Sequence, residues 1–173
     1  MSSSIYDISS WTASTNYNKF DIVSESNFYY YANYAHLSTS TFSTDLTAGV
    51  WAGKITDNGE VKKHFIWKPS YRGTTDNEPK VKKIQFGDQY KQLLPDGISN
   101  ILPVYNLAFD GIDLSETCAI LHFLENCGGS ESFLWVANAP RGKLARYTCS
   151  KWTDSFNFFN NYSINAVFER AVT

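Results

Sequence analysis

Only one stretch of this chain has the apolar periodicity of a helix, which leaves β-strands to form most of its regular structure. Residues 114–126 place apolar side chains on one helical face. The apolar positions of that face are Ala119, Ile120, Phe123 and Leu124. Asp113 can cap this helix, with Glu116 at capping-box spacing, and Gly128–Gly129 supplies the positive φ that favours a helix end. We therefore expect an all-β fold with one helix.

The other apolar segments are short, rich in aromatic residues and bounded by turn formers. Aromatic residues make up 16% of the chain, and aromatic side chains suit a pleated, half-buried surface. The segments that we expect to form strands are 20–26, 27–36, 80–86, 89–94, 101–109, 132–137, 144–153 and 162–172. Pro103 predicts an edge position or a bulge in its strand. We expect 37–49 to be loop and 69–80 to be a loop or hairpin tip that becomes ordered only in an assembly.

Charge and composition divide the chain at the turn formers of residues 56–59. We expect residues 1–53 to form a small, aromatic-rich β module and residues 62–173 to form a second domain. The module has one lysine against four acidic residues, a net charge of −3. Residues 62–91 have eight basic residues against three acidic ones, a net charge of +5. The basic segment is either a solvated loop, a partner interface or a wall facing DNA, and we favour the partner interface.

No pattern in the chain indicates catalysis, a metal or a cofactor. The three cysteines, at 118, 127 and 149, and the three histidines lack the spacing of a metal site or a disulfide framework. Nucleophile-elbow, Walker and dinucleotide motifs are absent. A net charge of −2 gives no overall attraction to nucleic acid or to a membrane, and we expect synthesis in the cytoplasm without export by the general route. An enzyme acting on cell wall stays open but has no signature.

A run of tyrosines in the module allows two interpretations. Tyr29 and Tyr31 share one face of the expected strand, while Tyr30 points to the other face. Their rings, with Tyr34 nearby, either form a small core or stack on the apolar faces of sugars.

Residues 62–173 carry motifs that resemble one known family. The matching positions are Phe86, Gly87, Asp88, Tyr90, Gln92, Gly128, Gly129, Phe133, Trp135, Cys149, Trp152, Phe168 and Glu169. In order and spacing they resemble the minor tail protein M family of lambda-like siphophages. The chain departs from that family at Gln89, where glycine is frequent, and in the segment VANAP after Trp135.

The resemblance implies a structural role at the tip of a phage tail. Such proteins share the tail-tube fold, a β-sandwich or barrel with a flanking helix and a long hairpin. Six copies would form a ring between the tail tube protein and the tip hub proteins, and the genome DNA would only pass through its lumen. The implied locations are the virion tail tip and, during assembly, the host cytoplasm.

The first 52 residues resemble small chitin- or cellulose-binding modules of the Y-x-x-G-D-x-V…Y…W type. The matching residues are Tyr17, Asp21, Val23, Tyr30 and Trp51, with Trp11 ahead of them and Phe20 in place of the glycine. The candidate glycan-binding residues are Trp11, Tyr17, Tyr29, Tyr31 and Trp51. Glycan binding as the main function is therefore the alternative hypothesis, with the second domain as a mount. A module that only packs against neighbouring proteins is the remaining interpretation.

Overall fold

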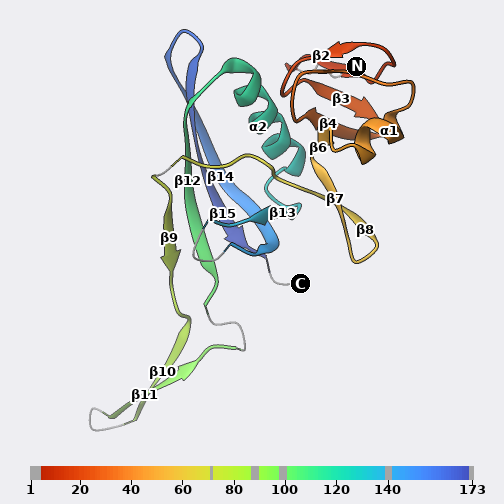
Figure 1. Cartoon of the computed structure of the whole chain (residues 1–173). Coiled ribbons are helices and arrows are strands. Elements are labelled where there is room, and N and C mark those ends of the chain that lie inside the picture. The colour runs from red at the N-terminus through yellow and green to blue at the C-terminus, as the bar shows by residue number, and fades with distance from the viewer. Residues whose placement is uncertain (1–4, 71, 87–89, 98–100, 139–141, 172–173) are drawn as a thin grey trace.

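The computed structural model describes residues 5–70, 72–86, 90–97, 101–138 and 142–171. It consists mainly of strands, with a longer helix, α2, against a long sheet and a small module beside that helix (Figure 1). The strands of the module are β1 Ile8–Ser10, β2 Asn16–Tyr17, β3 Ile22–Glu25, β4 Phe28–Ala32, β5 His36–Leu37 and β6 Trp51–Ala52. A hairpin of β7 Lys54–Asp57 and β8 Glu60–Lys63 follows.

The module is built on a four-stranded sheet with the order β1-β3-β4-β6. A two-residue turn joins β3 to β4, and its residues Ser26 and Asn27 both have positive φ, at 50° and 66°. That conformation matches the twist of an antiparallel hairpin. The two strands and the turn predicted here are confirmed. The turn at Asn58–Gly59 is confirmed as well, since both residues have positive φ between β7 and β8.

The prediction of loop over residues 37–49 was wrong, because a short helix, α1 Phe42–Thr47, lies within it. Tertiary contacts fix this turn of helix more than helix propensity does. The buried Asp45 carboxylate accepts hydrogen bonds from the backbone N–H of Thr39 at 3.1 and 3.2 Å. The Phe42 ring packs edge-on against Trp11 and Tyr30.

The second domain contains an antiparallel five-stranded sheet with the order β13-β14-β15-β12-β9. Its strands are β9 Thr74–Asn77, β12 Pro103–Ile112, β13 Phe133–Val136, β14 Leu144–Phe158 and β15 Asn161–Arg170. Helix α2, Leu114–Cys127, covers one face, and the main core lies between helix and sheet. Among the described residues the sheet does not close into a barrel. The all-β class with a flanking helix is confirmed.

Helix α2 begins and ends where the sequence predicts. The Asp113 carboxylate accepts a hydrogen bond from the Glu116 N–H at 2.8 Å, which satisfies a donor of the first turn. Gly128 adopts the left-handed conformation, with φ 58°, and its N–H donates to Leu124 and Glu125 carbonyls.

Two expectations for the second domain need correction. Residues 74–77 form strand β9 within the part expected to be loop, because they pair with β12 and because Asn106 Nδ2 donates to Asp76 at 2.7 Å and Thr74 at 3.2 Å. Pro103 occupies neither an edge strand nor a bulge: β12 lies between β15 and β9. Pro103 is the first residue of its strand, where a missing N–H is tolerated.

The main core continues into the module. Phe20, Ile22 and Tyr31 of the module belong to the same buried cluster as the side chains between α2 and the long sheet. A second, smaller cluster lies inside the module and consists of Tyr17, Val23, Tyr30, Ala32, Val50 and Trp51. The division into 1–53 and 62–173 stays a prediction, and the contacts across it are apolar and buried.

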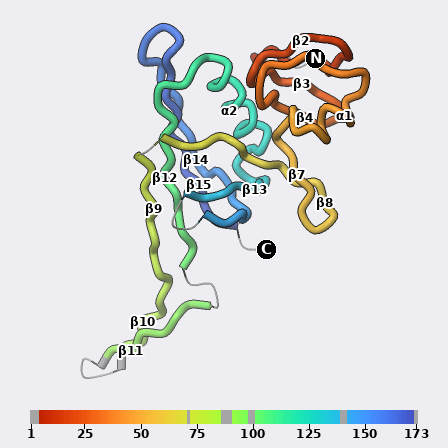
Figure 2. Tube along the Cα trace, viewed as in Figure 1, coloured from red at the N-terminus to blue at the C-terminus, as the bar shows by residue number. Residues whose placement is uncertain are grey.

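Strands β10 Val81–Phe86 and β11 Tyr90–Pro95 form a separate hairpin that projects beyond the end of β9 (Figure 2). This pair confirms the two strands predicted at 80–86 and 89–94. We call residues 78–97 the arm. The described side chains from 72 to 85 and from 91 to 97 are all exposed, so none of these side chains is buried against the rest of the described chain.

Candidate assembly surfaces

The C-x-x-W motif encodes a bulge in the longest strand. Alternation along a regular strand would place Cys149 and Trp152 on opposite faces of the sheet. The register shifts between Cys149 and Lys151, so that Cys149 lies opposite Phe168 and Trp152 lies opposite Ala166. The extra residue returns Trp152 to the core side, where it packs against the main cluster. The motif therefore positions two core residues and holds no reactive group, because burial raises the pKa of the Cys149 thiol to about 11.

The Gly-Gly motif turns the chain from α2 back onto the sheet. Gly128 and Gly129 have φ of 58° and 74°, a region that glycine adopts without strain. A Cβ atom at position 129 would lie 3.4 Å from the Cys149 carbonyl oxygen, so the helix end approaches β14 closely. Gly128 therefore ends the helix, and Gly129 permits the close approach of the helix end to the sheet.

Three predicted aromatic positions form one network in the core. Phe133, Trp135 and Phe168 are buried, and Phe168 contacts Phe133 and Trp135 with ring centroids 4.9 and 5.3 Å apart. These near-perpendicular contacts fix β13 against β15 across the intervening strand. Glu169, the next residue, is exposed on the opposite side of the sheet.

The remaining motif positions belong to the arm. The register pairs Phe86 with Tyr90 at the end of the hairpin, and Gln92 lies opposite Ile84. Gly87 and Asp88 lie outside the described residues. The F-G-D-x-Y-x-Q motif thus belongs to a projecting element, whereas the other motif residues belong to the sheet and helix.

The face of the long sheet opposite α2 is mainly polar. Its cross-strand rows are Thr148–Glu169–Val104, Lys151–Val167–Asn106, Thr153–Asn165–Ala108 and Ser155–Ser163–Asp110. Half of these twelve side chains carry hydroxyl or amide groups, three are charged, and several are exposed. Such a face offers hydrogen bonds with little net charge.

The five candidate glycan-binding rings are not gathered into an exposed platform. Tyr17, Tyr31 and Trp51 are buried, with Tyr31 in the main core and the other two in the module's own cluster. Trp11 and Tyr29 are half-buried, and Trp11 packs on Phe42. The predicted alternation of the tyrosine run is confirmed, because Tyr29 and Tyr31 contact His122 while Tyr30 faces the second cluster.

His122 of α2 joins the module to the second domain. Its ring packs against Tyr6, Tyr29 and Tyr31, with centroids 5.3, 4.7 and 5.9 Å apart. Its Nδ1 shares a 2.9 Å hydrogen bond with the Tyr31 hydroxyl. Burial and then the charge of Lys63 lower the pKa of His122 to about 4, so the ring is neutral at pH 7. This geometry is that of a buried, hydrogen-bonded core residue.

Within the described ranges, no cluster of histidine, cysteine or acidic side chains has the arrangement of a metal site. In the same ranges, no helix has the length and apolar character needed to cross a membrane.

Comparison with known proteins finds a family that matches residues 63–172. The model of that family is described as phage minor tail protein. The chain belongs to the phage minor tail protein family. It is 31% identical over 110 residues to "Tail tip protein M" of Escherichia phage lambda, an alignment that covers 64% of this chain and 98% of that protein. The match therefore spans the long sheet, α2 and the arm, while the module lies outside it.

Membership of this family establishes the coarse function. The protein is a structural component of a phage tail, located in the virion tail and in contact with other tail components. The expectation of no enzymatic activity agrees with a structural family.

Proposed function

We propose that this protein forms a ring at the tip of the tail, between the tail tube and the tip hub, with the module on the outside. The observation that carries the proposal is the asymmetry of the long sheet: one face is covered by α2 and the core, and the other is open and polar. Strand β9 ends the sheet order on one side, and the arm extends beyond it. Edge strands pair readily with other chains, so neighbouring copies can continue the sheet around a closed ring.

The open face suits the wall of a channel through which DNA slides. Thr153, Asn165 and Ser163 present neutral polar groups, and Lys151 is accompanied by Glu169 and Asp110 on the same face. A strongly basic lumen would bind the phosphate backbone and retard the passage of DNA. A hexamer joining tube to hub is the arrangement that we propose, by analogy with the family.

Immunogold labelling of purified tails tests the location. An antibody against residues 1–52 should place gold at one end of the tail, on the outside. Mass spectrometry of the same particles should detect the chain. Absence of the chain from the particles would refute a tail-ring role and indicate an assembly factor.

A pair of charge substitutions tests the orientation of the sheet. Thr153→Lys with Asn165→Lys should leave tails intact but lower DNA delivery, because both side chains would face the phosphate backbone. Ser43→Lys with Thr47→Lys adds the same charge on exposed positions of α1 and serves as the matched control. Equal DNA delivery by the two variants would contradict a lumen-facing sheet.

Contact with host glycans is not the function that we propose. Tyr17, Tyr31 and Trp51 stabilise the two apolar clusters, so a sugar could reach them only after local unfolding. Packing of the module against neighbouring tail proteins accords better with these buried rings.

A further inference from the structure

Each face of the arm carries exposed apolar residues: Val81 and Leu93 lie beside Lys83 and Lys91 on one face, and Ile84 and Leu94 lie on the other. Val81, Ile84, Leu93 and Leu94 are exposed large apolar residues, with 43%, 39%, 61% and 38% of their surfaces accessible. A two-stranded hairpin has marginal stability by itself in water. Exposed apolar residues on a projecting element are typical of an interaction site.

The arm has four lysines against Glu78, Asp88 and Asp96, a net charge of +1, and Lys83 and Lys91 share one face of it. Of its lysines, Lys82 forms an ion pair with Asp96 at 3.3 Å. Lys80, Lys83 and Lys91 have no ion pair in the described part of the chain and are exposed. A partner for the arm should therefore combine apolar and acidic groups.

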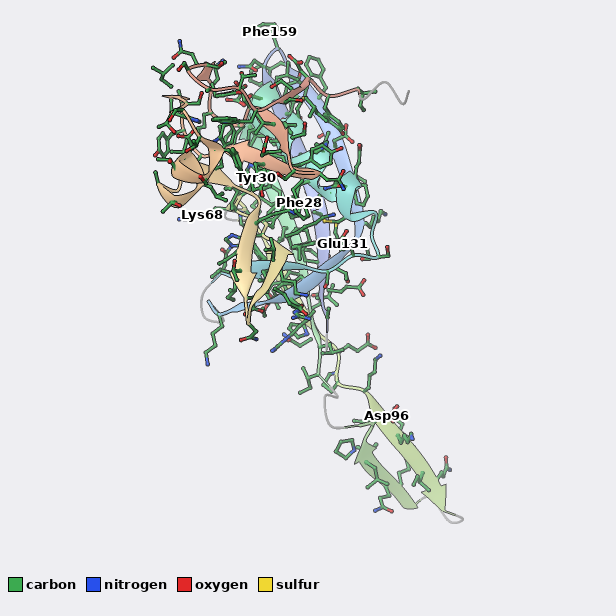
Figure 3. The ribbon with its side chains drawn as sticks, turned by 90° about the vertical axis from the view of Figure 1, so that its right-hand side faces the viewer. Phe28, Tyr30, Lys68, Asp96, Glu131 and Phe159 are labelled. Atoms are coloured by element: carbon green, nitrogen blue, oxygen red, sulfur yellow. The ribbon has the colours of Figure 1, made fainter. Side chains whose placement is uncertain are left out.

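The end of the molecule opposite the arm carries exposed apolar side chains. At the tip of the β14–β15 hairpin, Phe156, Phe158 and Phe159 are 66%, 64% and 90% exposed. Leu114, at the start of α2, is 51% exposed, and its N–H donates to the Asn160 side chain at 3.1 Å. Figure 3 shows Phe159 and Asp96 toward opposite ends of the molecule. Figure 1 shows the β14–β15 hairpin at one end and the β10–β11 hairpin at the other.

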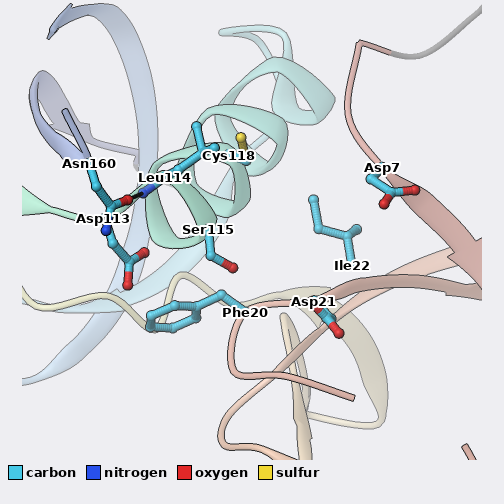
Figure 4. Close-up of a pocket in the computed structure, with 9 residues that line it drawn as sticks. All are labelled: Asp7, Phe20, Asp21, Ile22, Asp113, Leu114, Ser115, Cys118 and Asn160. Carbon is cyan, nitrogen blue, oxygen red and sulfur yellow. Dashed lines mark hydrogen bonds between the residues drawn. The ribbon is translucent and has the colours of Figure 1, made fainter. Parts of the chain in front are cut away.

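An acidic hollow adjoins this phenylalanine tip. It has a volume of about 440 Å³, and Asp7, Asp21 and Asp113 line it together with Cys118 and the tip residue Asn160 (Figure 4). None of the three carboxylates has an ion pair among the described residues. Asp21 and Asp113 accept only backbone N–H groups in the hydrogen bonds found there, at 2.7 and 2.8 Å.

Near the rim, Lys19 lies close to Glu116 and offsets its charge. The hollow therefore keeps an excess of negative charge beside the exposed phenylalanines.

We infer that the arm of one copy docks on the phenylalanine tip and acidic hollow of the next copy. Arm and tip are complementary in two independent respects, apolar surface and charge, and neither can reach the other within one chain because they lie at opposite ends. Contacts between two different patches of the same chain propagate head to tail, and they close into a ring when the rotation permits. The inference rests on the proposed function only in bringing several copies of the chain together in one tail.

A cross-link between native residues tests this contact in purified tails. A short amine-to-thiol reagent should join an arm lysine, Lys80, Lys83 or Lys91, to Cys118 in the hollow, and the product is identified by peptide mass spectrometry. Cys118 is half-buried and Cys127 and Cys149 are buried, so Cys118 is the accessible thiol of the three. Because a single chain keeps these groups at opposite ends, the product must join two copies.

Matched charge variants make the test specific. Lys83→Glu with Lys91→Glu should lower the yield of this cross-link at Lys80 at least tenfold. Lys68→Glu with Lys143→Glu changes the charge equally at exposed positions elsewhere and should not lower that yield. Asp7→Lys should restore part of the yield lost in the arm variant, because it reverses the opposite charge.

The outcomes separate this inference from the proposed function. Detection of the chain in tails without any arm-to-Cys118 product would leave the tail role standing and overturn the inference. Arm lysines joined instead to a tail tube or hub protein would likewise overturn it and identify the arm's partner. Absence of the chain from tails would refute the proposed function, and cross-linking of the concentrated isolated protein would then decide the inference alone.

Discussion

Acid should weaken the joint between the module and α2 through one residue, His122. Its ring is 7% exposed and lies among Tyr6, Tyr29 and Tyr31, with Nδ1 in a 2.9 Å hydrogen bond to the Tyr31 hydroxyl. A neutral ring with its proton on Nε2 accepts that bond from Tyr31. Protonation adds a charge that burial and the nearby Lys63 both disfavour, which is why the pKa falls to about 4.

The direction of the pH dependence of stability follows from proton linkage. In the unfolded chain the pKa of His122 is near 6.5, so between pH 6.5 and 4 the unfolded state binds a proton that the folded state excludes. The contribution of His122 to stability is therefore complete above pH 6.5 and is lost as the pH falls towards 4. The difference in pKa corresponds to at most about 3 kcal/mol, and solvent screening at the joint reduces the expected loss to about 1–2 kcal/mol.

Urea unfolding at pH 7.0 and 4.5 measures this loss as a difference between variants. His122→Gln removes the titrating group, so its free energy of unfolding should fall less between the two pH values than that of the wild type, by about 1–2 kcal/mol. His36→Gln, which changes a ring next to Tyr17 and Trp51 in the module, is the matched control and should retain the wild-type dependence. Equal pH dependence in His122→Gln and the wild type would refute the reasoning.

Three further predictions concern the helix end, the thiols and the arm. Gly129→Ala should lower the free energy of unfolding by about 1–3 kcal/mol in urea titration, because φ is 74° and the Cβ would crowd the Cys149 carbonyl; an unchanged midpoint would contradict this. In native protein, iodoacetamide should modify Cys118 before Cys127 and Cys149, whose pKa values burial raises to about 12 and about 11, as read by mass spectrometry; equal rates would indicate an open core. Replacing residues 79–96 by a short Gly-Ser linker should shift Tm by less than about 3 °C, since the described side chains at 79–85 and 91–96 are exposed; a larger fall would mean that the arm packs on the body.

The parts of the fold that local chemistry determines were predictable from sequence. Helix α2 carries its own signals, an Asp113 cap, an apolar stripe and a Gly128 end, and the structure has all of them. The β3–β4 turn at Ser26–Asn27 and the β10–β11 hairpin were predictable for the same reason, because turn residues and alternation act over a few positions.

The errors occurred where distant contacts decide the conformation. Helix α1 lies in a Ser/Thr-rich segment. It depends on the buried Asp45, which accepts the N–H of Thr39, and on the Phe42 ring, which packs on Trp11 and Tyr30 from elsewhere in the module. Strand β9 has no apolar alternation, and it forms through pairing with β12 and through Asn106. Neither kind of contact leaves a periodic pattern in the segment itself.

The burial of the candidate glycan-binding residues could not be predicted either. The sequence shows which residues are aromatic, but it does not show whether one face of a strand or both faces are covered by other parts of the fold. Tyr30 and Tyr31 point to opposite sides of β4, a pattern that usually leaves one ring exposed. Here both are buried, since α2 covers one side and the module's own cluster covers the other.

Phe20 supports the same conclusion: it stands where the resembling sugar-binding modules have glycine, and it adopts a positive φ of 68°. A bulky residue tolerates that conformation only when its burial compensates for the strain, and Phe20 packs 6.3 Å from Trp67 in the main core. A module with this core therefore packs on α2 and the main cluster through Phe20, Ile22 and Tyr31.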